Sequence, residues 1–506
     1  MIIDASTLDR DQNIRAQVCV IGSGAGGAVV AKELAESGVD VCLLEEGAYY
    51  RGADFTGRPR EMMDLLYRNR GLTGTVGKQT IPIPLGKCVG GTTTVNSGTC
   101  YRAPDYVLEA WQQEFAVVDI LEPQLRTYYE RVEREINVHP VADEVYGKNS
   151  KLFERGTEAL GFAGARIPRN EKGCLGTGVC AFGCPQDAKQ AMHVSYVPKA
   201  VAAGARLYTR CRADRILAAN GAAFGVLASA LDGKDRETGR QIRILADRVV
   251  VAAGALLTPA LLERSGIPDA SGWRGRNLHI HPAVRVGALF DEEVRAWEEV
   301  PQAYNVHQFT REGIFIQGQF VPPSVEAPVL PGIGAAHKSL MSRYPHMASF
   351  GALISDVSEG RVRGRGTGWP LVTYGMIHED VLKLTRAIAL TAQIFFAAGA
   401  QAVFSGISRF PILHSAEEAG ALTGERLKPT EFEVMAFHPQ GTCRMGEDPA
   451  RSVTDSYGAH HGTRGLLVAD ASLFPSSCKV NPQLTIMALA TRIAERLRSD
   501  LGGDAR

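Results

Sequence analysis

The 506-residue sequence lacks the features that would assign it to several specialised classes of protein. Lys plus Arg and Asp plus Glu both number 55, so there is no charge excess of the kind that binds nucleic acid or an anionic membrane. No apolar run reaches the roughly 18 residues of a spanning helix. The start, MIID, has neither the basic nor the apolar region of a secretory signal.

The cysteine content is also low for a disulfide-stabilised protein. Ten cysteines in a chain of this length do not make a disulfide scaffold, which favours a reducing compartment. Internal repeats and low-complexity linkers are absent, and the hydrophobic content of 45% is that of a globular protein. We therefore expect a cytoplasmic α/β protein of two associated domains, without nucleic-acid partners or a membrane span.

A glycine motif near the start predicts a dinucleotide site. Gly22, Gly24 and Gly27 satisfy G-x-G-x-x-G. In such a motif the first glycine makes a tight turn, the second lets the backbone approach a pyrophosphate, and the third lets a helix pack on its strand. A glycine-rich loop that only packs is the alternative.

The surroundings of the motif favour the dinucleotide site. Residues 18–21 are an apolar strand, residues 26–37 have helical periodicity, and residues 39–44 read as a second strand. Glu45 follows, 18 residues after Gly27, at the offset of an acid that binds a ribose hydroxyl. This pattern does not distinguish FAD from NAD.

Residues 86–96, GKCVGGTTTVN, form a second cluster of small residues. Its glycines allow the backbone to approach a planar or phosphate group closely, while threonine hydroxyls and Asn96 offer polar contacts. Without its context, the segment could equally be a tight loop.

With the first motif, this segment resembles the glucose–methanol–choline (GMC) family of FAD oxidoreductases. Further matches follow in the order of the family: VVVAAGALLTPALLERSGI at 249–267, GRNLHIHP at 275–282, HPQGTCRMG at 438–446 and VADAS at 468–472. Together the matches extend from residue 18 to residue 490. The resemblance implies a Rossmann-like FAD-binding domain of the GMC/p-hydroxybenzoate hydroxylase-like type and an α+β substrate domain built on an antiparallel sheet.

The resemblance also implies which residues bind FAD. Glu45 corresponds to the acid on the adenosine ribose, and Ala213 to a strand position whose backbone meets the adenine. The other implied contacts lie on the flavin-side loop, near the ribityl and pyrophosphate groups, and after Asn481: Gly86, Gly90, Gly91, Thr92, Asn96, Asp470, Ala471, Pro482 and Thr485.

Two residues correspond to the catalytic pair of the family. His438 opens the H-x-x-G-T-C-R-M motif at the position of the base, and histidine has the pKa that this role favours. Asn481 takes the second position, where its amide would orient the substrate oxygen. The Asn481-Pro482 sequence separately predicts a helix start, with Asn481 as N-cap and the positive end of the helix toward the flavin.

The other conspicuous histidines have less specific interpretations. His281 matches a family position near the domain junction and is expected to be structural. His460 and His461 lie in a segment that reads as an exposed loop.

Three cysteines, Cys174, Cys180 and Cys184, have the spacing C-x5-C-x3-C-P. Some bacterial sugar dehydrogenases of the family hold a [3Fe-4S] cluster on a similar trio, and three thiolates suit that cluster. The same stretch, GCPQDAKQ at 183–190, also fits the G-C-x-x-x-x-K-Q pattern of long-chain alcohol oxidases, which implies no cluster. Packed free cysteines, or one disulfide with a spare thiol, remain the alternatives.

The resemblance predicts a division of the chain. The FAD domain should comprise residues 1–110, 190–285 and 431–506, and the substrate domain residues 286–430. Residues 111–189 should form an excursion that carries the three cysteines.

The implied activity is FAD-dependent oxidation of an alcohol to an aldehyde or ketone, by hydride transfer to flavin N5 with His438 as base. The long-chain-oxidase pattern favours an apolar or bulky alcohol, with oxygen or an electron-acceptor protein as reoxidant. Alternatives are a sugar or polyol dehydrogenase that relays electrons through the cluster, and a non-redox relative of the hydroxynitrile lyase or fatty-acid photodecarboxylase type. A pure electron-transfer flavoprotein is disfavoured, because it would not need both His438 and Asn481.

Overall fold

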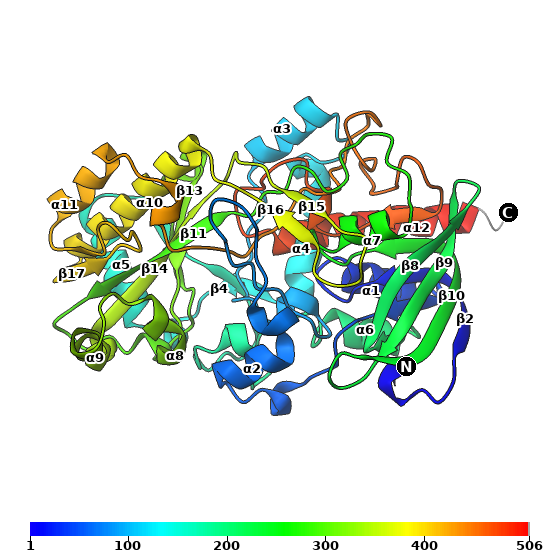
Figure 1. The fold of residues 1–506 in the computed structure, drawn as a ribbon, viewed down its shortest axis with the longest axis horizontal. Helices are drawn as coiled ribbons and strands as arrows, with labels where there is room; N and C mark the ends of the chain where they lie inside the picture. The colour runs from blue at the N-terminus through cyan, green and yellow to red at the C-terminus, as the bar shows by residue number, and fades with distance from the viewer. Residues whose placement is uncertain (504–506) are drawn as a thin grey trace.

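A computed structural model describes residues 1–503, which form two lobes, each built on one eight-stranded sheet (Figure 1). The first lobe contains both ends of the described chain. Its sheet has the order β1-β7-β3-β2-β10-β9-β8, and β20 also pairs with β10. Their bounds are β1 Ile2–Asp4, β2 Gln12–Ile21, β3 Val41–Leu44, β7 Arg206–Thr209, β8 Cys211–Ala219, β9 Ala222–Leu231, β10 Glu237–Val251 and β20 Leu466–Val468.

The parallel part of this sheet comes from the predicted strand–helix–strand unit. Strand β2 pairs in parallel with β3 on one side and β10 on the other. Because its last four residues, 18–21, lie between covered faces, all of them are buried. Helix α1, Gly27–Glu36, connects β2 to β3 and ends before Gly38, whose φ of +82° and N–H bond to Ala35 O terminate the helix.

Three further helices of this lobe pack with α1 or with one another: α4 Glu122–Glu135, α6 Tyr196–Ala202 and α12 Gln483–Gly503. Helix α1 packs against α6 and α12, and α12 packs against α4. The final helix of the described chain therefore covers the first helix, and the two ends of the sequence share one hydrophobic core.

The second lobe is built on an antiparallel sheet of order β18-β17-β11-β14-β13-β12-β5, with β19 also paired to β11. Helix α10, His378–Ala397, covers this sheet, and α5, Lys148–Ala159, packs on α10. Phe395 lies in the resulting core against Phe153, with ring centroids 5.0 Å apart. The strands are β5 Gly164–Arg166, β11 Pro282–Leu289, β12 Tyr304–Val306, β13 Ile314–Gly318, β14 Met347–Ile354, β17 Ala402–Phe404, β18 Ile412–Leu413 and β19 Val434–Ala436.

The lobes do not divide the chain at the expected residues. Strands β11 and β19 belong to the second sheet although 282–285 and 434–436 fall in the ranges expected for the FAD domain. The expected excursion, 111–189, is divided: α4 packs in the first lobe, while α5 and β5 join the second. Helix α4 buries its apolar side chains in the core of the first lobe, whereas α5, β11 and β19 bury theirs in the core of the second.

The other elements lie around and between the two sheets. Strands β4 Val138–Pro140 and β6 Pro168–Asn170 form one small pair, and β15 Arg361–Arg363 and β16 Leu371–Thr373 form another. The remaining helices are α2 Pro59–Leu66, α3 Asp105–Phe115, α7 Thr258–Arg264, α8 Pro323–Glu326, α9 Ala335–Ser342 and α11 Ala416–Ala421. Within residues 1–503, no helix has the length and hydropathy needed to cross a membrane.

Candidate active site

The three motif glycines have different surroundings at the carboxyl end of β2. A Cβ at Gly22, where φ is +98°, would lie 2.4 Å from Ala252 O, and one at Gly27 would lie 1.9 Å from Gly22 O. A Cβ at Gly24 would meet no protein atom within 4 Å. Thus Gly22 and Gly27 are required by the turn and by helix packing, while Gly24 leaves backbone open to a ligand.

The second glycine segment lies directly against the first. The Gly90 N–H donates to Ser23 Oγ at 3.0 Å. A Cβ on Gly91 would lie 3.2 Å from Gly24 Cα, and one on Gly86 would lie 2.5 Å from Gly91 O. Small residues are therefore needed in both segments, because their backbones form adjoining walls.

Glu45 closes the other side of this corner. Its carboxylate accepts the Ser23 hydroxyl at 2.6 Å, the Ser23 N–H at 3.1 Å and the Gly47 N–H at 2.9 Å. Burial raises the pKa of Glu45, and these hydrogen bonds oppose that rise.

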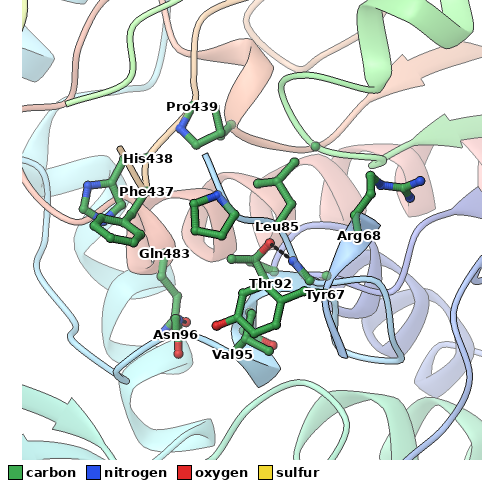
Figure 2. A pocket seen from close by; sticks show the side chains of 18 of the residues that line it. Tyr67, Arg68, Leu85, Thr92, Val95, Asn96, Phe437, His438, Pro439 and Gln483 are labelled. Atoms are coloured by element: carbon green, nitrogen blue, oxygen red, sulfur yellow. Dashed lines mark hydrogen bonds between the residues drawn. The ribbon is translucent and has the colours of Figure 1, made fainter. Parts of the chain in front are cut away.

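A cavity of about 460 Å³ connects this corner to the predicted catalytic pair. Figure 2 shows Thr92, Asn96 and His438 among the residues that line it. Most of the residues proposed from the sequence line it: Gly22, Gly24, Glu45, Gly86, Gly91, Thr92, Asn96, Ala213, His438, Asp470, Ala471, Asn481 and Pro482. Three of the proposed FAD-binding residues do not: Gly27, Gly90 and Thr485.

Thr485 has a structural environment. Its side chain is fully buried, and its Oγ1 accepts the Ala103 N–H at 3.2 Å and lies 3.0 Å from the Tyr129 hydroxyl. Thr485 therefore lies on the face of α12 that packs against α4, away from the cavity. Gly27 and Gly90 instead support the cavity wall through the packing described above.

Several cavity residues were not identified from the sequence. Arg68 forms a two-pronged ion pair with Glu46, and Arg264 donates to the carbonyl oxygens of Ala213 and Asp214 at 2.7 Å each. No local pattern marks either arginine, because each reaches the cavity only through tertiary packing.

His438 and Asn481 meet at the cavity wall. His438 Nε2 lies 3.2 Å from Asn481 Nδ2, and Asn481 Oδ1 is buried without a hydrogen-bond partner in residues 1–503. The prediction that Asn481 caps the final helix is wrong. Helix α12 begins at Gln483 and the Ile486 N–H donates to Pro482 O at 3.0 Å, so Pro482 takes the cap position and the Asn481 side chain is left to the site.

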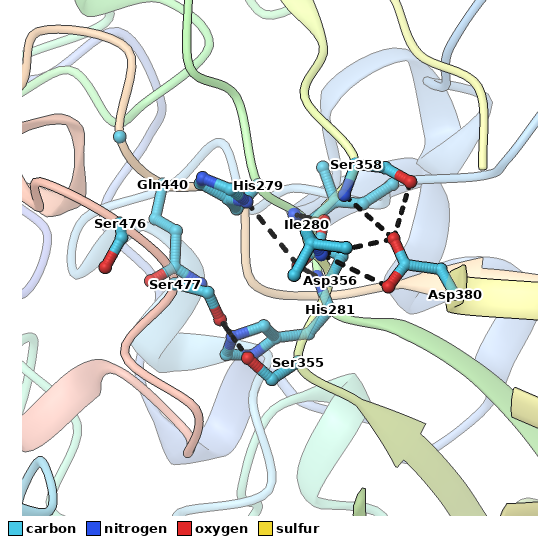
Figure 3. A network of polar contacts seen from close by, with 12 residues as sticks. His279, Ile280, His281, Ser355, Asp356, Ser358, Asp380, Gln440, Ser476 and Ser477 are labelled. Atoms are coloured by element: carbon cyan, nitrogen blue, oxygen red, sulfur yellow. Dashed lines mark hydrogen bonds and ion pairs between the residues drawn. The ribbon is translucent and has the colours of Figure 1, made fainter. Parts of the chain in front are cut away.

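A second histidine, His281, contacts the Nδ1 side of the His438 ring. His281 Nδ1 lies 3.2 Å from His438 Nδ1. On the other side of the ring, His281 Nε2 lies 2.7 Å from Ser477 Oγ (Figure 3). The Gln440 amide lies 3.0 Å from the same Nε2, and Ser355 Oγ lies 2.8 Å from Ser477 Oγ. His281 is thus in direct contact with the proposed base, which its expected structural role did not include.

Burial controls the charge of both histidines. It lowers the pKa of His438 to about 4, and it lowers the pKa of His281 well below its ordinary value, with a smaller effect from the neighbouring His438. Both imidazoles are therefore neutral near pH 7, so the His438 ring has one unprotonated nitrogen.

His460 differs from its prediction. It is buried, and its Nδ1 accepts the Gly462 N–H at 3.1 Å. His461 is exposed as expected, although its Nε2 contacts Ser452 Oγ at 3.0 Å. The sequence does not show this difference because both residues lie in one irregular loop.

Models of the GMC oxidoreductase family match residues 63–283 and 356–490, and a model of the NAD(P)-binding Rossmann-like domain matches residues 20–66. An uncharacterised GMC-type oxidoreductase of Mycobacterium tuberculosis is 40% identical over 484 residues, which are 95% of this chain and 76% of that protein. The chain is a GMC oxidoreductase. Its predicted fold class, with a Rossmann-like domain and a second domain on an antiparallel sheet, is confirmed.

Other proteins similar to this GMC oxidoreductase have named activities. A long-chain-alcohol oxidase of Arabidopsis thaliana is 29% identical over 525 residues, covering 96% of this chain and 69% of the relative. The crystal structure of pyridoxine 4-oxidase from Mesorbium loti has a TM-score of 0.71 at 19% identity, covering 95% of this chain and 99% of that one. The second likeness concerns the fold alone.

The residues of this GMC oxidoreductase suit the FAD that its family uses. The open backbone at Gly24 stands beside the start of α1, where unpaired N–H groups favour a pyrophosphate. Glu45 could hold the ribose, and the 86–96 segment and the start of α12 could hold the flavin end. These groups line one continuous cavity that also reaches His438.

The three cysteines do not form a cluster site. In the described chain, no group of three or more His, Cys, Asp or Glu side chains is arranged to hold a metal ion, and all ten cysteines are free. The cavity beside Cys174, Cys180 and Cys184 measures about 10 Å³, which is room for about one water.

Buried cations occupy the space that a cluster would need. Arg169 donates to Cys180 Sγ at 3.5 Å and to Glu171 at 2.9 Å, while the Lys189 ammonium donates to the carbonyl oxygens of Cys180 and Thr94, each at 2.9 Å. Burial lowers the pKa of Lys189 to about 8. The structure therefore does not support the [3Fe-4S] hypothesis. The cysteine segment instead contacts the flavin-side loop through the hydrogen bond from Lys189 to Thr94 O.

Proposed function

We propose that this enzyme oxidises an alcohol to an aldehyde or ketone and that oxygen is its reoxidant. The observation that carries the proposal is the meeting of His438 Nε2 and the Asn481 amide, 3.2 Å apart, on the wall of the cavity that also contains the dinucleotide motif. The alcohol oxidase relatives support the same reaction.

When bound, FAD supplies the hydride acceptor for the carbinol carbon. His438 takes the hydroxyl proton, because burial leaves its imidazole neutral and able to accept a proton at Nε2. The Asn481 side chain is not used by a helix cap, so its amide can hydrogen-bond the substrate oxygen. His281 restrains the His438 ring through Nδ1.

The start of α12 contributes to the same wall. Asn481, Pro482, Gln483 and Ile486 all line the cavity. Because an α-helix carries partial positive charge at its N-terminus, this position favours negative charge at the flavin end of the cavity.

The proposed substrate is an apolar or bulky alcohol. Beyond His438, the cavity wall formed by the second lobe is mostly apolar and includes Ala283, Pro301, Phe320, Val321, Pro322, Val325, Leu353, Met435 and Phe437. The long-chain-alcohol oxidases among the relatives support this choice.

The ten free cysteines support the expected reducing compartment.

Anaerobic rapid mixing with a panel of alcohols tests the proposal. At least one alcohol should bleach the flavin absorbance near 450 nm, and admission of air should restore it with formation of hydrogen peroxide. His438→Ala should retain FAD and reduce it about 10²–10⁴-fold more slowly.

Three results would each contradict one part of the proposal. Flavin reduction in His438→Ala at the wild-type rate would show that His438 is not the base. Cleavage of a cyanohydrin without bleaching by any alcohol would assign the enzyme to non-redox chemistry instead. Bleaching that air does not reverse would point to an electron-acceptor protein in place of oxygen.

A further inference from the structure

The wall that the second lobe gives to the cavity has one polar corner. Among its mostly apolar residues, three side-chain amides line the cavity: Gln302, Gln317 and Gln319. Gln317 and Gln319 lie on or beside β13, and Gln302 precedes β12. Nothing in the proposed chemistry uses these groups.

Gln302 is held in place by its neighbours. Its Oε1 accepts the Thr99 hydroxyl at 2.7 Å, and its backbone carbonyl accepts a hydrogen bond from Arg169 at 3.3 Å. Gln319 lies over β14, so close that a Cβ on Gly351 would come within 2.8 Å of its Oε1. Gly351 therefore makes room for the amide.

Gln317 is the most informative of the three. Only 5% of it is exposed, and its Oε1 is buried with no partner in the described part of the chain. Asn305 is its direct cross-strand neighbour, and Asn305 Oδ1 is likewise without a partner among residues 1–503. A buried carbonyl without a hydrogen bond costs about 1–3 kcal/mol, so two neighbouring ones require an explanation.

Gln317 also lines the cavity. A hydroxyl bound there can supply the donor that the Gln317 amide oxygen lacks within the described chain.

The corner is uncharged. Apart from His438, the acidic and basic residues that line the cavity belong to the dinucleotide half: Glu45, Glu46, Arg68, Arg212, Arg264 and Asp470. In the described chain no acid or base lines the second-lobe wall, so nothing there would compensate a buried carboxylate, phosphate or ammonium. The amides suit a neutral hydroxyl, which both donates and accepts.

We propose that Gln302, Gln317 and Gln319 bind a second, uncharged hydroxyl of the substrate, remote from the carbon that is oxidised. This inference rests on the proposed alcohol oxidation and narrows its substrate class to a bulky diol or polyol. Strands β14 and β11 lie between β13 and β19, the strand that leads to His438. Three spacings of about 4.8 Å separate β13 from β19, or roughly 14 Å, so a short diol cannot reach both places.

Matched 1-alkanols and α,ω-diols of six to twelve carbons test the proposal. For each, kcat/KM is measured by flavin reduction for the wild type, Gln317→Leu, and the control Gln124→Leu on the exposed face of α4. The wild type should prefer the longer diols over the equally long alkanols by about tenfold or more. Gln317→Leu should remove that preference by slowing the diols alone, and Gln124→Leu should keep it.

Equal values for diols and alkanols at every length, or an equal loss on both in Gln317→Leu, would overturn the proposal. Gln302→Leu provides a second variant if Gln317→Leu does not fold, and should show the same selective loss. If no alcohol of either series reduces the flavin, the proposed function fails separately. The corner is then judged by binding: quenching of flavin fluorescence at lower concentrations of diol than of alkanol, lost in the variant, supports it, and equal binding refutes it.

Discussion

Gly24 of the first motif and the nearby Gly26 allow a test that separates cofactor binding from folding. Gly24 and Gly26 are two residues apart, and neither has a positive φ, so alanine is conformationally acceptable at both. A Cβ at Gly24 would meet nothing within 4 Å, whereas one at Gly26 would lie 1.6 Å from Ala469 O. We expect Gly24→Ala to lose FAD and Gly26→Ala to lose stability.

The magnitudes follow from these contacts. Gly24→Ala should leave the apoprotein as stable as the wild type or stabilise it by about 0.4–1 kcal/mol, because alanine restricts the unfolded chain. Its methyl group projects where a pyrophosphate would meet the backbone, and overpacking of about 1–3 kcal/mol would weaken FAD binding roughly 5- to 150-fold. For Gly26→Ala, the helix must move from the end of β20 by more than 1 Å, a cost at or above the upper end of that range.

The assay compares the melting temperature of FAD-stripped protein with the dissociation constant of added FAD for both variants. The expected pattern is a wild-type apoprotein melt with weak FAD binding for Gly24→Ala, and a markedly lower melt for Gly26→Ala. Wild-type FAD affinity in Gly24→Ala would refute the role of the open glycine. A wild-type melt in Gly26→Ala would refute the packing argument.

The remaining predictions concern pH, the final helix and the cysteines. Because the folded pKa of His438, about 4, lies below its ordinary value of about 6.5, the unfolded chain binds more protons between these pH values. The free energy of unfolding should thus fall by up to about 3 kcal/mol on account of His438 as the pH falls through that window. His438→Asn should therefore show a smaller decrease in melting temperature between neutral and acid pH than the wild type. An equal decrease in both proteins would refute the lowered pKa of His438. Thr485→Val should lower the melting temperature through its lost hydrogen bonds to Ala103 and Tyr129, about 1 kcal/mol, yet leave FAD affinity unchanged; a loss of FAD would restore Thr485 to the site. Anaerobically purified protein should contain no stoichiometric iron or sulfide, and a 3:4 iron-to-sulfide content lost when Cys174, Cys180 and Cys184 become serine would reinstate the cluster.

The sequence pattern predicted local structure correctly where the residues that determine that structure lie close together in the chain. The β2–α1–β3 unit was predicted because the apolar run at 18–21, the glycine spacing, the helical periodicity and Glu45 all lie within about 35 residues of chain. Each of these features depends on backbone geometry or burial that neighbouring residues impose.

Positions that depend on distant partners were misjudged. Asn481 and Pro482 have the composition of a cap and a first turn, yet the contact with His438 gives the asparagine a different neighbour. Thr485 follows the same motif, but the face of α12 that carries Thr485 packs against α4 and not against the cavity. A sequence pattern specifies periodicity and not which surface a helix face will meet.

The sequence by itself determined the family, the dinucleotide fold and many of the residues that line its cavity, because glycine spacing and short motifs act through local backbone conformation. Only the tertiary structure decided that His281 supports His438, that Arg169 and Lys189 fill the space among the cysteines, and that three glutamines share one corner. These groups come from segments far apart in the chain, so their contacts exist only after two sheets have folded and packed together.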